Sequence, residues 1–273
     1  MINKADKFID VDALIKEKNP GIHRFIPRFI LRYLSETVIH ESQFNEFMTE
    51  HFDVLNFDFC RAVCEHFDVK VRVEGLENIP KEGGVIFAAN HPLGGMDAMV
   101  VMSTMDQCRT DVKFLVNDVL MNIPNLKKLF VGVNKFGLTA RDGIRAVDEA
   151  FAADNALFIF PAGLVSRMTQ YKVIRDLDWK KTFVTKSRKY NKPIVPVHIS
   201  GQLSNRFYRL AKIRKFLGIR VNLEMLLLAQ EILKQGGKTI VVKYGKPIQP
   251  SELNKSIKDQ EWAYEIKKRA YNL

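Results

Sequence analysis

Short apolar segments that suit β-strands alternate with helix-length segments along most of the chain after residue 68. The strand signals fall at 69–74, 84–89, 112–116, 156–160, 194–199 and 239–242. Several intervening stretches, around 96–105, 140–153 and 180–190, are long enough for helices. Alternation of this kind is typical of an α/β fold with a largely parallel sheet flanked by helices.

The beginning of the chain has a different pattern. Apolar residues recur there at helical spacings, as in Phe44, Phe47 and Met48, which indicates amphipathic helices. We therefore predict a helical N-terminal extension at 1–66 and an α/β domain at 67–273. A chain of 273 residues with 47% hydrophobic content is large enough to bury a sizeable core.

A histidine and an aspartate lie together directly after the strand predicted at 84–89. The sequence Asn-His-Pro-Leu-Gly-Gly-Met-Asp places His91 and Asp97 on one glycine-containing turn. A carboxylate beside a histidine fixes its tautomer and stabilises the imidazolium, so that the ring can take a proton from an attacking hydroxyl. The alternative is that His91 is an ordinary loop histidine and that Asp97 caps the following helix. In a parallel sheet, ligands gather at the carboxyl ends of the strands, where His91 and the turn at 161–163 both fall.

Four blocks of sequence together resemble the glycerolipid acyltransferase family, which includes the 1-acylglycerol-3-phosphate acyltransferases. That family has a strand ending in Asn-His, then four residues and Asp, a substrate-binding block, Phe-Pro-Glu-Gly, and a strand beginning Pro-Ile-Val-Pro. Here the blocks read NHPLGGMD at 90–97, GVNKFGLTAR at 132–141, FIFPAG at 158–163 and KPIVPVHISG at 192–201. The resemblance covers residues 71–201 and implies an α/β acyltransferase.

The spacing of the first block departs from the family pattern, because five residues separate His91 from Asp97. Gly94 and Gly95 can adopt positive φ at little steric cost, so a tight bend there would restore the hydrogen bond. This spacing with paired glycines resembles the branch that O-acylates N-acyl amino acids to give ornithine or glycine lipids.

The third block departs as well, since Ala162 stands where the family has the glutamate of Phe-Pro-Glu-Gly. In the phosphate-headgroup enzymes, that block and a basic residue of the second block help to hold glycerol phosphate. The missing polar group implies that the head of the acceptor is held differently here. Both departures point away from lysophosphatidate as the acceptor.

The second block offers cations for substrate binding. Lys135 and Arg141 flank Phe-Gly-Leu-Thr, and either can face an acceptor's carboxylate or an acyl donor's phosphate. The alternative is that Thr139 caps the helix predicted at 140–153, with Arg141 and Asp142 a solvated pair. Either interpretation stays open.

Two residues of the third block complete the substrate-binding candidates. Gly163 closes the block, and Arg167 lies near the place where the family often has an arginine after Phe-Pro-Glu-Gly, so it is a candidate anion contact. Ser166 lacks the glycine spacing of a nucleophile elbow, which weighs against a serine hydrolase.

The resemblance implies a reaction without a metal, a bound cofactor or a covalent acyl-enzyme. His91 acts as general base on the acceptor hydroxyl, Asp97 orients the imidazole, and the hydroxyl attacks an acyl thioester carried by acyl carrier protein or coenzyme A. Backbone amides near Gly94, Gly95 or Gly163 are candidates for stabilising the oxyanion.

A formal net charge of +11 calls for an anionic partner. Basic residues are interleaved with large apolar ones at 23–33 and 206–216, which suits helices lying in an anionic headgroup layer. The basic surface also suits an acidic acyl carrier protein. Ordinary amphipathic helices packed on the domain are one alternative. Nucleic acid is the other, but no RNP-like or zinc-knuckle signature accompanies these segments, and we expect no nucleic-acid partner.

The chain is expected to be cytoplasmic and peripheral on the inner face of the cell membrane. Apolar runs such as 84–89 and 225–229 fall far short of the roughly 20 residues of a spanning helix. The N-terminus lacks the apolar core of a signal peptide. Three cysteines suit a reducing compartment, and Cys60 and Cys64 are expected to pack in the core rather than bind a metal.

The leading functional prediction is an O-acyltransferase that esterifies the hydroxyl of an N-(3-hydroxyacyl) amino acid. Its nearest rival is acylation of lysophosphatidate. The non-enzymatic alternatives are an inactive membrane-surface binding protein and a basic nucleic-acid-binding protein. A working pair requires His91 and Asp97 within hydrogen-bond reach, about 2.6–3.2 Å.

Overall fold

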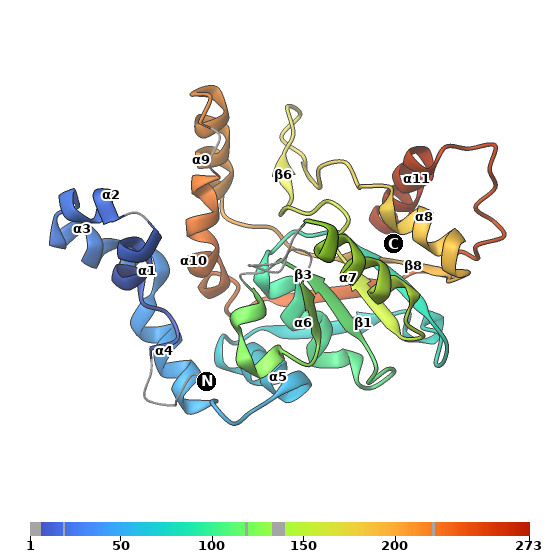
Figure 1. Cartoon of the computed structure of the whole chain (residues 1–273), viewed down its shortest axis with the longest axis horizontal. Helices are drawn as coiled ribbons and strands as arrows, with labels where there is room; N and C mark the ends of the chain where they lie inside the picture. Colours follow the sequence, from blue (N-terminus) through green and yellow to red (C-terminus); the bar gives the residue numbers. More distant parts are fainter. Residues whose placement is uncertain (1–6, 19, 118–119, 133–139, 220–221) are drawn as a thin grey trace. The chain divides into compact units, whose positions relative to one another are not determined.

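The computed structural model describes residues 7–18, 20–117, 120–132, 140–219 and 222–273 (Figure 1). The chain forms two compact units. The first unit joins residues 1–54 to 203–236, and the second joins 55–202 to 237–273. The division predicted between residues 66 and 67 stays a prediction, and these units are divided differently.

The second unit is built on a seven-stranded sheet. In chain order its strands are β1 (Lys70–Glu74), β2 (Val85–Ala89), β3 (Lys113–Val116), β4 (Phe130–Gly132), β5 (Ala156–Ile159), β8 (Ile194–Ile199) and β9 (Thr239–Tyr244). Their spatial order is β1-β9-β8-β2-β5-β3-β4. All neighbours run parallel except β8 and β9, which are antiparallel. The predicted α/β fold with a largely parallel sheet is confirmed.

Helices flank this sheet. The second unit contains α5 (Asn56–His66), α6 (Gly95–Met105), α7 (Ala140–Ala152), α8 (Thr182–Tyr190) and α11 (Asp259–Tyr271), short 3-10 segments at Leu76–Asn78, Leu120–Asn122 and Pro124–Leu126, and a hairpin of β6 (Arg167–Met168) and β7 (Ile174–Arg175). The helices predicted around 96–105, 140–153 and 180–190 are confirmed as α6, α7 and α8. Short strand β4 and the hairpin were not predicted, because two- and three-residue strands carry no periodicity.

The first unit is helical. It contains α1 (Val11–Lys18), α2 (Pro20–Phe25), α3 (Arg28–Arg32), a π-helical segment (Tyr33–Ile39), α4 (Glu41–Glu50), α9 (Asn205–Phe216), a 3-10 segment (Leu223–Leu227) and α10 (Leu228–Leu233). The buried carboxylate of Glu41 accepts hydrogen bonds from the Val11 amide at 3.0 Å and Lys7 Nζ at 2.9 Å. It therefore ties α1 to α4, because a buried carboxylate is stable only with such partners. A second buried carboxylate, that of Glu231 in α10, accepts the Ser204 amide at the start of α9.

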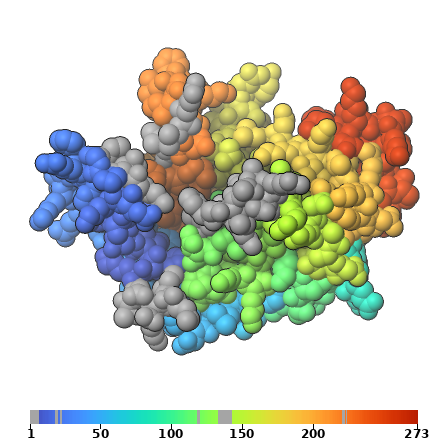
Figure 2. All heavy atoms as spheres, in the orientation of Figure 1, coloured from blue at the N-terminus to red at the C-terminus, as the bar shows by residue number. Residues whose placement is uncertain are grey.

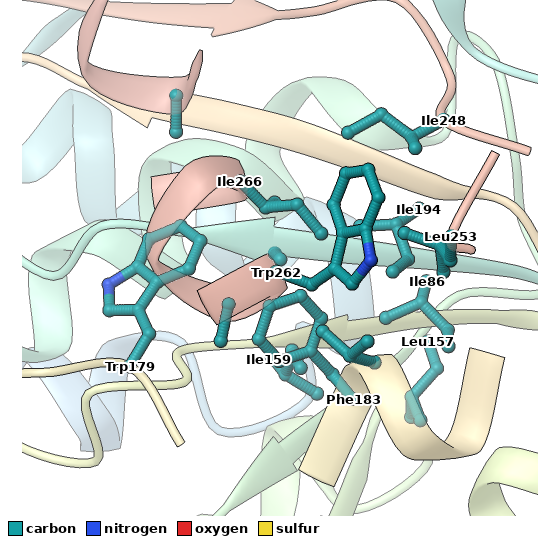
Figure 3. Packing of buried hydrophobic residues seen from close by; sticks show 14 of the residues in the cluster. Ile86, Leu157, Ile159, Trp179, Phe183, Ile194, Ile248, Leu253, Trp262 and Ile266 are labelled. Atoms are coloured by element: carbon teal, nitrogen blue, oxygen red, sulfur yellow. The ribbon is translucent and has the colours of Figure 1, made fainter. Parts of the chain in front are cut away.

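Apolar residues of the central strands and of helices α7, α8 and α11 form one core cluster of the second unit. Ile86, Leu157 and Ile194 come from β2, β5 and β8, and Phe183 of α8 packs against them. Helix α11 adds a stripe at i, i+4 and i+8, namely Trp262, Ile266 and Ala270. Figure 3 shows Trp262 and Ile266 among the residues of this cluster. That spacing is the signature of an amphipathic helix, although the helix was not among those predicted.

The cysteines of α5 are buried, as predicted for core packing. Cys60 is 0% exposed and Cys64 5% exposed. Burial raises the pKa of the Cys64 thiol to about 11 and that of Cys60 further. Both thiols are thus protonated near neutral pH and pack as small apolar groups.

Among the described residues, no helix combines the length and the apolar composition that crossing a membrane would demand.

Docking of α11 on the sheet is testable at Ile266, which is fully buried. We expect Ile266→Ala to lower the free energy of unfolding by about 2–5 kcal/mol, through lost transfer energy and a residual cavity. The matched Ile266→Val should cost about 0.5–1.5 kcal/mol. Denaturant titration measures both, and equal small losses would contradict the packing described here.

Candidate active site

Neighbouring parallel strands bring two of the sequence blocks together. Strands β2 and β5 pair in register, with Phe87 opposite Phe158, so their carboxyl ends lie side by side. His91 follows β2 and Phe160 follows β5, and their rings stack with centroids 4.2 Å apart. The expectation that both blocks meet at one edge of the sheet is confirmed.

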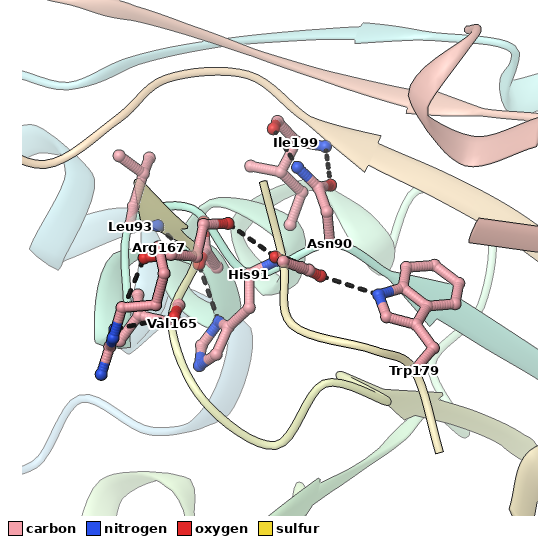
Figure 4. A network of polar contacts seen from close by, with 10 residues as sticks. Asn90, His91, Leu93, Val165, Arg167, Trp179 and Ile199 are labelled. Atoms are coloured by element: carbon pink, nitrogen blue, oxygen red, sulfur yellow. Dashed lines mark hydrogen bonds and ion pairs between the residues drawn. The ribbon is translucent and has the colours of Figure 1, made fainter. Parts of the chain in front are cut away.

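Asn90 fixes the end of β2 to β8 on its other side. Its Nδ2 donates to the Ile199 carbonyl at 2.8 Å, and its Oδ1 accepts the Ile199 amide at 2.6 Å (Figure 4). The side chain thus imitates a strand pairing and holds the backbone immediately before His91. The motif contains Asn90, but sequence reasoning gave it no role.

His91 and Asp97 form the expected hydrogen bond despite the longer spacing. His91 Nδ1 lies 2.8 Å from Asp97 Oδ2, which also accepts the Leu93 amide at 2.8 Å. The Asp97 side chain is fully buried, whereas that of His91 is 20% exposed. The carboxylate selects the tautomer with hydrogen on Nδ1, which leaves Nε2 with a lone pair to accept a proton. No described residue forms a hydrogen bond with Nε2.

The extra residue is accommodated at Gly94. It has φ 69° and ψ −129° and is the N-cap of α6, a conformation that residues with a Cβ rarely adopt. Gly95 is the first residue of α6, and its φ is not positive. Of the two glycines, therefore, Gly94 makes the bend. The bend turns Asp97, in the first turn of α6, back toward the histidine.

Asp97 lies in an environment that favours a positive neighbour. Burial raises the pKa of its carboxyl group, while the hydrogen bond and charge of His91 and the Leu93 amide act in the opposite direction. Asp97 Oδ1 is buried and has no hydrogen-bond partner among the described residues. A proton arriving on His91 supplies the missing counter-charge, so the pair is suited to general base chemistry.

The Pro-Ala-Gly turn after β5 is tightly packed. Gly163 has φ 69°, and its amide donates to the Phe160 carbonyl at 3.0 Å. Ala162 is 6% exposed and belongs to the apolar core cluster. A glutamate at residue 162 would have to place its carboxylate in this apolar surrounding or displace the turn.

Of the remaining predicted binding residues, the structure describes the side chain of Arg167 but not those of Lys135 and Arg141. Arg167 begins β6, and its Nη1 donates to the Val165 carbonyl at 2.8 Å. Lys135 lies outside the described residues. Arg141 belongs to α7, but its side chain is also outside them. The catalytic roles of His91 and Asp97 and the binding roles of these residues stay predictions.

Asp176 was missed by sequence reasoning. Its Oδ1 accepts the amide of His91 at 3.1 Å, although 85 residues separate the two. No motif or spacing in the sequence marks this aspartate, because the contact is made only when β6, β7 and the end of β2 come together.

The bend at Gly94 predicts unequal effects of two neighbouring substitutions. We expect Gly94→Ala to lower the free energy of unfolding by about 1–3 kcal/mol, because a Cβ strains this backbone conformation. Gly95→Ala should be neutral or slightly stabilising, because alanine favours a helix over glycine. Thermal unfolding compares the two, and an equal effect would argue against the bend.

Comparison with known proteins shows the family of this chain. The model of a family described as "Acyltransferase" matches residues 13–273. A lyso-glycine lipid O-acyltransferase of Bacteroides thetaiotaomicron is 43% identical over 266 residues, which cover 97% of each chain. One of the same name from Phocaeicola vulgatus is 41% identical, over 97% of this chain and 95% of that one. The crystal structure of the 1-acyl-sn-glycerophosphate acyltransferase PlsC of Thermotoga maritima covers 88% of this chain and 90% of its own, at 19% identity and a TM-score of 0.46, a likeness too slight to carry an argument. By the family match and the two close relatives, this chain belongs to the acyltransferase family.

Proposed function

We propose that the protein transfers a fatty acyl group from a thioester to the hydroxyl of an N-(3-hydroxyacyl) amino acid, with a lyso-glycine lipid as the acceptor. The observation that carries the proposal is the 2.8 Å hydrogen bond between His91 Nδ1 and buried Asp97, which leaves Nε2 to act as a base. The two relatives that match nearly the whole chain are named for acyl transfer to lyso-glycine lipid.

In this mechanism, His91 Nε2 takes the proton of the acceptor hydroxyl while the hydroxyl oxygen attacks the thioester carbonyl carbon. The new C–O bond forms and the C–S bond breaks. The departing thiolate then receives the proton from the imidazolium. Asp97 stabilises that imidazolium, because it is buried and its Oδ1 has no hydrogen-bond partner among the described residues.

The developing oxyanion needs hydrogen-bond donors at the same end of the sheet. We assign this role to the amides of Gly94 and Gly95, because they lie at the N-terminus of α6, an eleven-residue helix. The first amides of a helix have no partner within it and carry partial positive charge. The Gly163 amide is engaged by the Phe160 carbonyl, so it is the weaker candidate.

The acceptor's head carries a carboxylate rather than a phosphate in this proposal. Ala162, where phosphate-headgroup enzymes have a glutamate, lies buried in the core cluster. Position 162 therefore offers no polar group to a glycerol-phosphate head. Lys135, Arg141 and Arg167 are the proposed cations for the carboxylate of the acceptor or for the donor's phosphate. Lysophosphatidate remains the second candidate acceptor.

The assay compares purified wild type with His91→Ala and Asp97→Asn, using acyl carrier protein and coenzyme A thioesters as donors. We expect diacylated glycine lipid from the lyso-glycine lipid, and a loss of about 10²–10⁴-fold in turnover in either variant, because general base catalysis supplies about that factor. Mass spectrometry measures the product. Phosphatidate formed in preference from lysophosphatidate would overturn the acceptor, and full activity of His91→Ala would overturn the base.

A lipid acceptor requires access to a membrane surface, and we propose that the first unit provides it through two basic, apolar segments. Phe25 and Phe29 are 83% and 73% exposed, next to exposed Arg24 and Arg28. The orange segment in Figure 2 contains α9, where Phe216 is 89% exposed. Arg206, Arg209, Lys212, Ile213 and Lys215 of α9 are exposed as well.

Exposed phenylalanines between cations suit an anionic bilayer, because the rings enter the acyl boundary while the charges meet the headgroups. The protein would then be peripheral on the inner face of the cell membrane. The same cations can attract an acidic acyl carrier protein as the donor. We propose no bound cofactor beyond the thioester co-substrate.

Vesicle binding tests the membrane proposal. We expect Phe25→Ser and Phe216→Ser each to weaken partitioning onto anionic vesicles by about tenfold, since burying a phenylalanine contributes about 1.5–3 kcal/mol. Tyr264→Ser is the matched control, because Tyr264 is 62% exposed but lies on α11. Equal binding to zwitterionic vesicles would contradict the role of charge. Equal loss in the Tyr264 variant would contradict the role of the first unit.

A further inference from the structure

We propose that Asp176 is a positioning residue for His91, and that together with Ser166 it clamps the main chain of the catalytic histidine. This proposal rests on the proposed role of His91 as the base. It does not depend on which acceptor the enzyme uses, because Asp176 and Ser166 contact the main chain of His91.

The side chain of Asp176 collects donors from three different segments. Its Oδ1 accepts the His91 amide at 3.1 Å and the Ser166 hydroxyl at 2.6 Å. Its Oδ2 accepts Trp179 Nε1 at 2.8 Å (Figure 4). Asp176 is 6% exposed, so these bonds lie away from bulk water, where a hydrogen bond to a carboxylate is strong.

Ser166 closes the clamp from the other side. Its amide donates to the His91 carbonyl at 2.8 Å, and its hydroxyl is bonded to the same Asp176 oxygen that holds the His91 amide. Both main-chain polar groups of His91 are therefore held by residues that flank the β6–β7 hairpin. Strand β2 ends at Ala89, so the sheet itself does not fix the histidine's backbone.

The clamp is anchored on α11. Tyr271 accepts the Asp176 amide at 2.8 Å through its hydroxyl oxygen, and Lys267 Nζ donates to the Asp176 carbonyl at 2.8 Å. The guanidinium of Arg175 lies 4.1 Å from the centre of the Tyr271 ring. Since α11 packs on the sheet through Ile266, the aspartate is tied to the rigid core.

His91 is thus held at three places. Asp97 holds Nδ1, the ring of Phe160 supports one face of the imidazole, and Asp176 with Ser166 holds the backbone. The position of the His91 backbone determines the position of its imidazole ring. A displacement of about 1 Å at a reacting group can lower the rate by about 10²-fold. Only a carboxylate can accept at both oxygens, whereas an amide must turn its NH₂ group toward one of these donors.

The primary experiment measures kcat and KM of Asp176→Asn on whichever acceptor the wild type uses. We expect kcat to fall about 10–100-fold, as for other partners that orient a reacting group, while KM for donor and acceptor stays within about threefold. Asp178→Asn is the matched control. Asp178 is exposed, and its substitution removes the same charge two residues away from Asp176. It should retain wild-type kcat.

Two further readouts separate positioning from loss of folded protein. In Asp176→Asn, the side-chain NH₂ group would face another donor, either the N–H of Trp179 or the donors that bind Oδ1. Adding Trp179→Phe removes the Trp179 donor, and the double variant should therefore regain part of the lost kcat. The His91 amide should also exchange with solvent faster in Asp176→Asn, because its acceptor is weakened. A merely destabilised protein would show neither the rescue nor this local change.

The outcomes are distinguishable from those of the proposed function. If the wild type acylates lysophosphatidate and no lyso-glycine lipid, the proposed acceptor is wrong, but the kcat values of Asp176→Asn and the wild type can still be compared on lysophosphatidate. Wild-type kcat in Asp176→Asn, unchanged exchange at the His91 amide, or a kcat loss that merely follows the folded fraction would each overturn the clamp.

Discussion

The hydrogen bond between His91 Nδ1 and the buried carboxylate of Asp97 is the interaction on which the rest of the site depends. It selects the tautomer, leaves Nε2 as the proposed base, and gives a buried carboxylate the partner that it needs. The bond exists because Gly94 adopts a backbone conformation that residues with a Cβ rarely adopt. A longer spacing than the family pattern therefore leaves the hydrogen bond intact, since one glycine accommodates the extra residue.

The surroundings of this pair are assembled by the sheet. Parallel pairing of β2 with both β5 and β8 brings three blocks of sequence to one edge, where Phe160 supports the imidazole and Asn90 bonds to Ile199. Helix α11 then fixes Asp176 against the histidine's backbone. Elements from both halves of the chain thus hold one residue, which is how a fold provides the precise geometry that catalysis requires.

The departure at Ala162 has a structural consequence as well as a chemical one. The residue belongs to the apolar core cluster, so the position contributes packing and no polar group to the site. The His91–Asp97 pair and the residues proposed to bind the acceptor's head therefore lie at different positions of the chain, and one can differ from the family pattern without the other. Membership of the acyltransferase family follows from matches over nearly the whole chain, whereas the proposed choice of acceptor head rests on local residues such as Ala162 and Arg167.

The sequence by itself determined the α/β class, most of the strands, helices α6, α7 and α8, and the meeting of His91 with the turn at 161–163, because these follow from periodicity and from the geometry of parallel strands. It also pointed to a glycine bend between His91 and Asp97. Only the tertiary structure decided that Gly94 makes the bend, that β9 is antiparallel to β8, and that Asp176 reaches His91. These features rest on contacts between residues far apart in the chain, and such contacts leave no local periodicity or spacing from which they can be predicted.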